Sequence, residues 1–378
     1  MTNNQFFLSR GTTLQGGKYV ITNFIASGGF GITYEARHAI LDRRVAIKEF
    51  FVKDFCNRNG DSTTVSVGTR SREELVAKLK KKFINEAIAI SKFDNPNIVR
   101  VHDVFEENGT AYYVMDFIDG QSLKDIVKAN GALSEAKSLK YIRQIASALA
   151  EVHKQNRLHL DVKPSNIMIN KDDDAILIDF GASKQYDIDG ENTSTLIGLT
   201  PGYAPLELID GAVKIFTPAT DIYSLGATLF KITTGVTPLK PTELLIKGGI
   251  DLPDNMSPII KEAIKSSMLV NPDSRPQRIE DFLTILNNTH ATAQVNYSIE
   301  SIVDANNEET LIYDDINPNH TNHNDDHLST EVAGEKKEMV VAKTPSKALD
   351  REWLGILVMS ALIAAIVLFI TLWAISQV

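Results

Sequence analysis

A short stretch near the middle of the chain, RLHLDVKPSNIMI, combines side chains that could transfer a charged group. It holds His159, Asp161, Lys163 and Asn166 at the spacing HxDxKxxN. Asp161 could accept a proton from a hydroxyl group, Asn166 could hold a cation, and Lys163 could offset negative charge on the transferred group. Thirteen residues beyond Asn166, Asp179 follows the apolar run AILI and offers a second oxygen ligand for magnesium.

Two features that lie earlier in the chain, a glycine-rich stretch and a lysine, could bind phosphate. In ASGGFGIT, residues 26–33, Gly28 and Gly31 would let backbone amides approach phosphate oxygens, although tight hairpins also use glycine. In the apolar segment VAIK, burying Lys48 costs free energy unless an anion meets it. Glu86 is the natural carboxylate to orient this lysine, with a plain salt bridge as the alternative.

The elements that must position these residues divide into a strand-rich part and a helical part. Alternating apolar patterns predict strands over residues 21–38, 43–51 and 111–118. Apolar residues at helical spacing predict helices over residues 75–93, 134–155, 219–235 and 256–269. Ser134 is placed to act as an N-cap. We therefore expect a small strand-rich lobe and a larger helical lobe that ends near Leu286.

The order of these features resembles the eukaryotic-type protein kinases from about Tyr19 to Leu286: glycine loop, strand lysine, helix glutamate, HxDxKxxN and DFG. The resemblance implies an α+β, bilobal kinase-like fold with a small antiparallel β lobe plus one helix. It also implies transfer of the γ-phosphoryl group of ATP, with Mg2+, to protein substrates.

The resemblance also assigns roles. Asp161 would be the catalytic base assisted by Lys163, and Lys48 would contact the α- and β-phosphates while paired with Glu86. Asn166 and Asp179 would hold magnesium, Met115 would be the gatekeeper residue, and the backbone of residues 116–118 would receive adenine. The implied ATP-binding positions are Ala26, Ser27, Gly28, Gly29, Phe30, Gly31, Thr33, Ala46, Lys48, Met115, Asp116 and Ile118.

Further positions are implied around the segment GLTPGYAPLE. Thr200 would bond Asp161 and Lys163, which is the serine/threonine-type pattern. Glu207 would pair with Arg275, and an aspartate in DIYSLG would support the catalytic loop. These structural and substrate-segment residues are Thr200, Glu207, Asp221 and Arg275.

Some residues depart from the family pattern. Ala26 stands where the first loop glycine is usual and Thr33 where valine is usual, which should alter the flexibility of the loop without abolishing nucleotide contact. PLE replaces the usual APE at residues 205–207. Because Glu207 is kept, its ion pair should survive.

Leu160 occupies a position where many kinases have arginine. That arginine is an unpaired positive charge that a phosphate on the activation segment neutralises. Leucine removes this demand. We therefore expect that phosphorylation of Thr193, Ser194 or Thr195 is not an obligatory on-switch.

The segment between Lys48 and Glu86 is longer than in typical family members. It resembles an insertion, at about residues 51–80, in bacterial kinases whose lysine motif begins IKEFF. This points to a bacterial source and to a surface that could contact a partner. A tolerated loop is the alternative.

Composition limits the other possibilities. With 378 residues, 43% hydrophobic and 23% charged, the chain can form about two domains or one bilobal unit with appendages. Cys56 is the only cysteine, which excludes an internal disulfide. The net charge of -9 gives no indication of nucleic-acid binding. The N-terminal extension, residues 1–18, lacks the pattern of a signal peptide.

The C-terminal part reads differently. Residues 287–350 form an acidic, flexible linker with twelve Asp or Glu against four Lys. In it, Thr310 has acidic flanks that would suit a phosphothreonine-binding partner. Residues 353–373 are 21 residues without charge, about 31 Å of helix at 1.5 Å per residue, which predicts a transmembrane helix in the lipid bilayer.

Flanking charges orient this helix. Lysines and an arginine precede it and only the short tail 374–378 follows, so the positive-inside rule predicts a cell-membrane protein with a cytoplasmic kinase domain. Small residues at positions 360, 361, 364 and 365 could pack two such helices into a homodimer.

Two other functions compete. A membrane-tethered pseudokinase scaffold would not need the full set of Lys48, Glu86, Asp161, Asn166 and Asp179. A small-molecule phosphotransferase of related fold would lack the peptide-positioning segment GLTPGYAPLE. The sequence therefore favours a membrane-anchored serine/threonine protein kinase.

Overall fold

The computed structural model describes residues 6–29, 31–59, 63–68, 70–180, 184–185, 200–209 and 216–288. All of them belong to one compact unit, residues 1–310. Among the described residues no helix combines the length and apolarity that crossing a membrane requires. The expected span 353–373, most of the linker with Thr310, and the sites at residues 193–195 lie outside the described residues.

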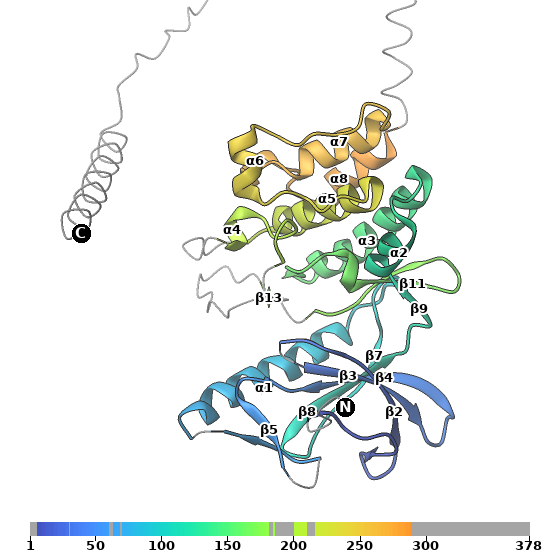
Figure 1. The fold of residues 1–378 in the computed structure, drawn as a ribbon, viewed down its shortest axis with the longest axis vertical. Coiled ribbons are helices and arrows are strands. Elements are labelled where there is room, and N and C mark those ends of the chain that lie inside the picture. The colour runs from blue at the N-terminus through green and yellow to red at the C-terminus, as the bar shows by residue number, and fades with distance from the viewer. Residues whose placement is uncertain are drawn as a thin grey trace, which may run out of the picture. The chain divides into compact units, whose positions relative to one another are not determined.

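A six-stranded antiparallel sheet forms the first lobe, with strand order β1-β2-β3-β4-β8-β7 (Figure 1). Its strands are β1 (Thr13–Leu14), β2 (Tyr19–Ser27), β3 (Gly31–His38), β4 (Arg43–Phe50), β7 (Val101–Glu107) and β8 (Thr110–Asp116). β2 and β3 meet at the glycine-rich turn, as the sequence pattern predicted. The register places Lys48 of β4 opposite Thr33 and Tyr113.

The two faces of this sheet have different coverings. On the face of Lys48, helix α1 (Arg70–Ile90) packs through Phe83, whose ring centroid lies 5.7 Å from that of Phe50 and 5.0 Å from that of Tyr113. On the opposite face lie Ile47 and Tyr112, both fully buried. Because both faces are covered, every residue of β4 from Val45 to Phe50 is buried except Lys48, which is partly buried.

The covering of the second face comes from segments outside the expected core. Leu8 and Leu14, in the predicted N-terminal extension, are buried, so this extension packs as part of the lobe. The predicted insertion forms a hairpin of β5 (Cys56–Arg58) and β6 (Val65–Val67). Helix α1 begins at Arg70, inside the range expected for the insertion and before the predicted start at residue 75. The prediction started too late because the first turn of the helix is polar and lacks the apolar stripe that was used to locate it.

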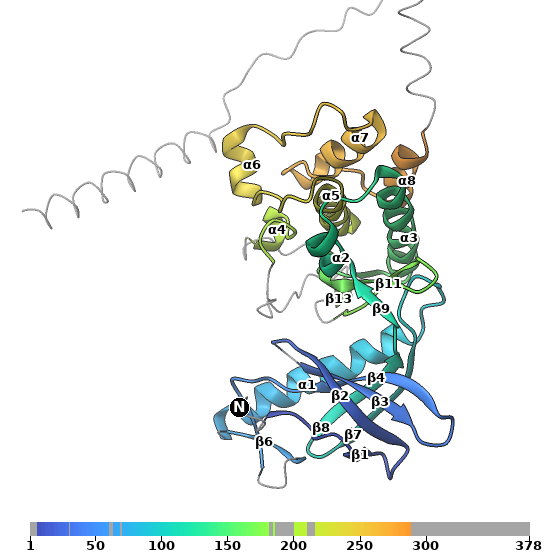
Figure 2. The same ribbon diagram turned by 45° about the vertical axis from the view of Figure 1, so that its right-hand side comes forward.

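The second lobe is helical (Figures 1 and 2). Its α-helices are α2 (Leu123–Asn130), α3 (Glu135–Lys154), α4 (Leu206–Ile209), α5 (Pro218–Thr234), α6 (Pro241–Lys247), α7 (Pro258–Ser267) and α8 (Ile279–Asn287). The Ser134 side chain accepts a hydrogen bond from the Lys137 amide, so the predicted N-cap of α3 is confirmed. The α+β, two-lobed architecture predicted from the sequence is also confirmed.

Short strands and turns lie between the lobes. They are β9 (Gly120–Ser122), β10 (Arg157–Leu158), β11 (Ile167–Asn170), β12 (Ala175–Leu177) and β13 (Lys184–Gln185), with a 3-10 turn at Pro164–Asn166. A second 3-10 turn, Pro272–Ser274, lies in the helical lobe beside α5. β9, β11 and β12 form one small sheet and β10 pairs with β13.

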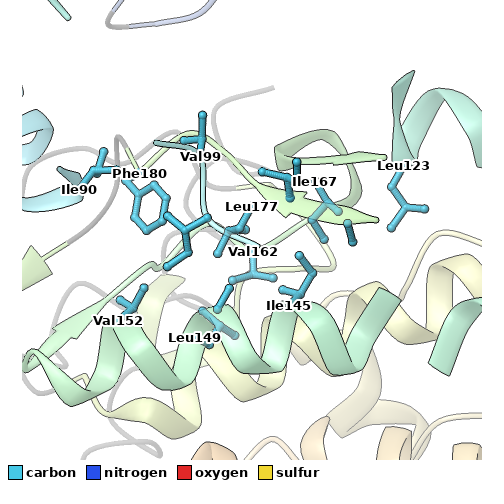
Figure 3. Close-up of a cluster of buried hydrophobic side chains, with 14 of the residues drawn as sticks. Ile90, Val99, Leu123, Ile145, Leu149, Val152, Val162, Ile167, Leu177 and Phe180 are labelled. Carbon is cyan, nitrogen blue, oxygen red and sulfur yellow. The ribbon is translucent and has the colours of Figure 1, made fainter. Parts of the chain in front are cut away.

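An apolar cluster supports these strands from below (Figure 3). Ile145, Leu149 and Val152 repeat along one side of α3 and face Val162 and Leu177. All five side chains are completely buried. The apolar face of α3, which the sequence periodicity predicted, therefore packs against the loop that carries Asp161 and supports it.

Candidate active site

The loop from β10 to β11 is held by a buried aspartate. Asp221 of α5 accepts hydrogen bonds from the amides of His159 at 2.9 Å and Leu160 at 2.8 Å, and lies 2.8 Å from Nε2 of His153. Burial works to raise the pKa of Asp221, but the hydrogen bonds from His153 and the His159 amide lower it below its ordinary value. Asp221 therefore remains ionised and fixes two consecutive amides of the loop.

Leu160 has an unusual backbone and a buried side chain. Its φ angle is 63°, in the left-handed region that non-glycine residues seldom adopt. Its side chain packs in a small apolar cluster with Leu158, Ala204 and Leu208. Many kinases have an arginine at this position. Here the leucine instead makes apolar contacts that connect the loop to Ala204 and to Leu208 of α4.

Two polar side chains contact Asp161, and one of them links it to Thr200. Lys163 Nζ lies 2.8 Å from Asp161 Oδ2, and Asn166 Nδ2 donates to the same oxygen at 2.9 Å. Lys163 Nζ also donates to Thr200 Oγ1 at 2.8 Å. A direct bond from Thr200 to Asp161, which was expected, is not among those formed by the described residues. Lys163 instead joins the two.

Lys48 reaches across to the other lobe. Its Nζ lies 2.6 Å from Asp179 Oδ1, and no ion pair between Lys48 and Glu86 occurs among the described residues. The expected Lys48–Glu86 pairing is therefore not the arrangement of this structure. Burial favours the uncharged form of Glu86, so the partner of Lys48 is the more exposed Asp179.

The environment of Glu86 has a measurable consequence. Burial raises its pKa to about 7, while the nearby charge of Lys48 acts in the opposite direction. Its Oε1 atom is buried without a hydrogen-bond partner in the described part of the chain. For Lys48 burial works to lower the pKa, but Asp179, Tyr113 and Glu86 raise it well above the ordinary value. The site therefore holds a charged lysine beside a carboxyl group that titrates near neutrality.

The predicted magnesium ligands fit a divalent cation. The amide of Ile178 donates to the carbonyl oxygen of Asn166 at 2.9 Å, which places Asp179 directly beside Asn166. The Asp179 φ angle is 60°, a left-handed value that turns the chain at this point. Mg2+ takes oxygen ligands and is usually bound by one or two side-chain groups together with waters and phosphate oxygens. These two residues would hold the ion.

The positions expected to contact adenine lie on the Lys48 face. Ala46 and Met115 are opposite one another in the ladder of β4 and β8. The amide of Asp116 already donates to the carbonyl of Arg100 at 3.0 Å. The Asp116 amide is therefore already engaged, and the expected contact of residues 116–118 with adenine stays a prediction.

The glycine-rich turn closes over β4. The Gly28 amide donates to the Gly31 carbonyl at 2.8 Å, and Ala26 pairs with Thr33 across the hairpin. A Cβ atom on Gly31 would lie 2.7 Å from the carbonyl oxygen of Glu49, so only glycine fits there. Ser27 and Gly29 lie in the same turn, and Phe30 lies outside the described residues.

A buried ion pair holds the end of the Thr200 segment. Arg275 donates to both carboxylate oxygens of Glu207, at 2.6 and 3.1 Å. This geometry is the two-point pairing typical of arginine and carboxylate. The pair predicted from the sequence is therefore present.

Sequence reasoning missed two residues of the site. The Tyr113 ring centroid lies 5.8 Å from Lys48 Nζ, and His153 contacts Asp221. Tyr113 could have been found from its register opposite Lys48. His153 gave no signal, because only the fold brings the end of α3 to α5.

Comparison with known proteins agrees with this geometry. The family model described as "Protein kinase domain" matches residues 19–292. A probable serine/threonine-protein kinase of Clostridium perfringens, CPE1738, is 30% identical over 300 residues, which cover 76% of this chain and 41% of that protein. The serine/threonine-protein kinase PrkC of Bacillus subtilis is 34% identical over 223 residues, covering 59% of this chain and 31% of PrkC.

A solved structure is similar as well. The chain described as "PpkA-294 apo form" has 29% sequence identity and a TM-score of 0.65, and the match covers 75% of this chain and 100% of that one. The present chain spans less than half the length of the two curated relatives.

Proposed function

Because the chain belongs to the protein kinase domain family, we propose that it is a serine/threonine protein kinase that uses Mg2+ and ATP. The observation that carries this proposal is the meeting of Lys163 with both Asp161 and Thr200. In this arrangement the Asp161 carboxylate, which can accept a proton, lies beside the positive charge of Lys163. Lys163 also contacts the Thr200 segment, which would present a peptide. A serine or threonine hydroxyl would be received there.

The proposed reaction is an in-line displacement. Asp161 accepts the proton of the substrate hydroxyl as its oxygen bonds to the γ-phosphorus, and the bond to the β–γ bridging oxygen breaks to release ADP. Lys163 offsets charge on the transferred group, and Lys48 binds the phosphates that remain. Mg2+ neutralises phosphate charge when bound. Each role uses a residue whose contacts are described above.

The competing functions have less support. A scaffold without activity has no need of a lysine, a base, an amide and a carboxylate in this arrangement. A phosphotransferase for small molecules would not need a Thr200 segment fixed by the buried Glu207–Arg275 pair. Protein phosphorylation uses all of these features.

The test is phosphate transfer by the full chain. The wild type is incubated with Mg2+, γ-labelled ATP and a generic basic protein, beside Asp161→Asn and the matched variant Asp172→Asn on the exposed turn. We expect label on serine or threonine, a loss of about 100-fold or more for Asp161→Asn, and unchanged activity for Asp172→Asn. Transfer by Asp161→Asn at the wild-type rate would contradict the assignment.

Regulation follows from Leu160. Because its buried side chain makes apolar contacts that need no phosphate, we expect the triple variant T193A/S194A/T195A to keep most of the wild-type activity. The measurement is the initial transfer rate of both proteins after phosphatase treatment. Complete loss of activity in a triple variant that retains its helical circular dichroism would show that a phosphate is required after all.

We also propose that the protein is attached to the cell membrane of a bacterium through residues 353–373, with residues 1–350 in the cytoplasm. The support is the sequence alone: 21 uncharged residues preceded by lysines and an arginine. Pairing of two such helices would give a homodimer. Cell fractionation of the full chain and of a chain ending at residue 350 tests attachment, since only the former should sediment with membranes.

A further inference from the structure

The residue next to Lys48 is charged and lies on the face of the sheet opposite to Lys48 and Asp179. Glu49 follows Lys48 in β4, so its side chain points to the opposite face of the sheet. That face would be open to water if nothing covered it. Yet the Glu49 side chain has an exposed fraction of 0%. A buried carboxylate is costly unless its charge and both oxygens are compensated.

Four hydrogen bonds compensate the Glu49 carboxylate. Tyr34 of β3 donates to Oε2 at 2.8 Å, and Tyr112 of β8 donates to Oε1 at 3.1 Å. Arg58 donates to Oε1 from Nη1 at 3.1 Å and to Oε2 from Nη2 at 2.7 Å. Each oxygen therefore has two donors, which come from the two strands beside β4 and from the insertion hairpin.

Arg58 is also completely satisfied. Its Nε and Nη2 donate to the Phe6 carbonyl at 3.1 and 3.0 Å, and its Nη1 donates to the Thr63 carbonyl at 3.0 Å. With the two bonds to Glu49, all five N–H groups of the guanidinium have an acceptor. A lysine could not make this set, because it lacks the planar fork.

The same residue of β4 supports the glycine-rich turn through its backbone. Gly31 packs so closely on the Glu49 carbonyl that a methyl group would be excluded. On the other face of β4, the Lys48 side chain forms an ion pair with Asp179. Rotation or displacement of β4 would therefore break bonds of Glu49 on one face and move Lys48 on the other.

From these contacts we infer that Glu49 and Arg58 are positioning residues for Lys48, acting from the far face of the sheet. The inference rests on the proposed function, in which Lys48 binds ATP phosphates. It assigns the insertion hairpin a part in nucleotide binding, because the hairpin supplies Arg58. Neither residue touches the substrate in this role.

The test uses the full chain and separates stability from positioning. Arg58→Met alone leaves a buried unpaired carboxylate and can prevent folding. The double variant Glu49→Gln/Arg58→Met removes both charges and keeps hydrogen-bonding atoms near Tyr34 and Tyr112. Arg58→Lys keeps the charge without the fork. The matched control is Asp103→Asn, which weakens a network of β2 and β7, where Asp103 lies 2.6 Å from Lys18 Nζ, in the same sheet.

Two quantities are measured for each protein that retains its circular dichroism: the dissociation constant of a non-hydrolysable ATP analogue with Mg2+ and the kcat and KM for ATP. Displacing a reacting group by about 1 Å costs roughly 100-fold in rate. We expect the double variant to bind the analogue about tenfold more weakly and to lose kcat, while Asp103→Asn stays within twofold of the wild type.

Wild-type binding and kcat in the folded double variant would overturn the inference, as would an equal loss in Asp103→Asn. If the double variant does not fold, Arg58→Lys is judged by the same criteria. A wild-type chain that binds the analogue but transfers no phosphate would contradict the proposed function alone. The binding comparison would still decide the positioning role.

Discussion

Replacing Glu86 with glutamine should make the folded protein more stable at alkaline pH. Glu86 is buried without an ion pair to Lys48, and burial raises its pKa to about 7 from the ordinary value of 4.5. The folded state therefore binds this proton more tightly than the unfolded state does. Glutamine has nearly the same shape and carries no charge, so it removes the titration.

The sign and size follow from proton linkage. Below about pH 4.5 the carboxyl group is protonated in both states, and its neutral form carries no penalty. Between about pH 4.5 and pH 7 only the folded state keeps the proton, so stability falls as the pH rises through this window. A shift of about 2.5 pKa units at 1.36 kcal/mol per unit corresponds to about 3 kcal/mol lost above pH 7.

The assay is urea unfolding of both chains from pH 5 to pH 8.5, followed by circular dichroism at 222 nm. Circular dichroism is used because the described residues of the two lobes include no tryptophan. The quantity of interest is the difference in unfolding free energy between Glu86→Gln and wild type, because other titrations cancel in it. We expect this difference to grow by about 2.5 kcal/mol in favour of glutamine, because less than about 1 kcal/mol of the effect is already present at pH 5. A difference that stays constant across the range would refute the reasoning.

Two other substitutions test contacts of the site. Glu207→Ala should lower the unfolding free energy by about 3–5 kcal/mol, because it leaves the buried guanidinium of Arg275 uncompensated; an unchanged urea midpoint would contradict this. Gly31→Ala should raise the KM for ATP, because its methyl group would lie 2.7 Å from the Glu49 carbonyl and force the glycine-rich turn away from β4. An unchanged KM would show that the turn can shift without cost.

The elements that carry strong periodicity could be predicted from the sequence. The apolar repeat and the Ser134 cap located α3, and the alternating runs located β2 and β3 on either side of the glycine-rich turn. The spacing of HxDxKxxN brought Asp161, Lys163 and Asn166 to one loop because local chain geometry decides their separation. These features depend on residues close together in the chain.

Features that depend on packing between distant segments could not be predicted. The hairpin of β5 and β6 lies in a polar run whose strands are three residues each, too short for a period-two pattern to emerge. The choice of Asp179 over Glu86 as the partner of Lys48 depends on burial, which motif spacing does not encode. Leu160 was identified as unusual, but its left-handed backbone and its apolar contacts follow only from the fold.

The buried N-terminal segment makes the folded domain longer than the region of sequence similarity. Similarity to the family begins at residue 19, whereas Leu8 is buried and its amide donates to Tyr34. A fusion protein that begins at residue 19 would contain the whole family match but would lack Leu8 and Leu14. The apolar residues of the sheet that these two side chains cover would then be exposed to water. The exposed apolar residues would then favour aggregation. The smallest portable unit of this protein therefore starts no later than Phe6, whose carbonyl accepts from Arg58.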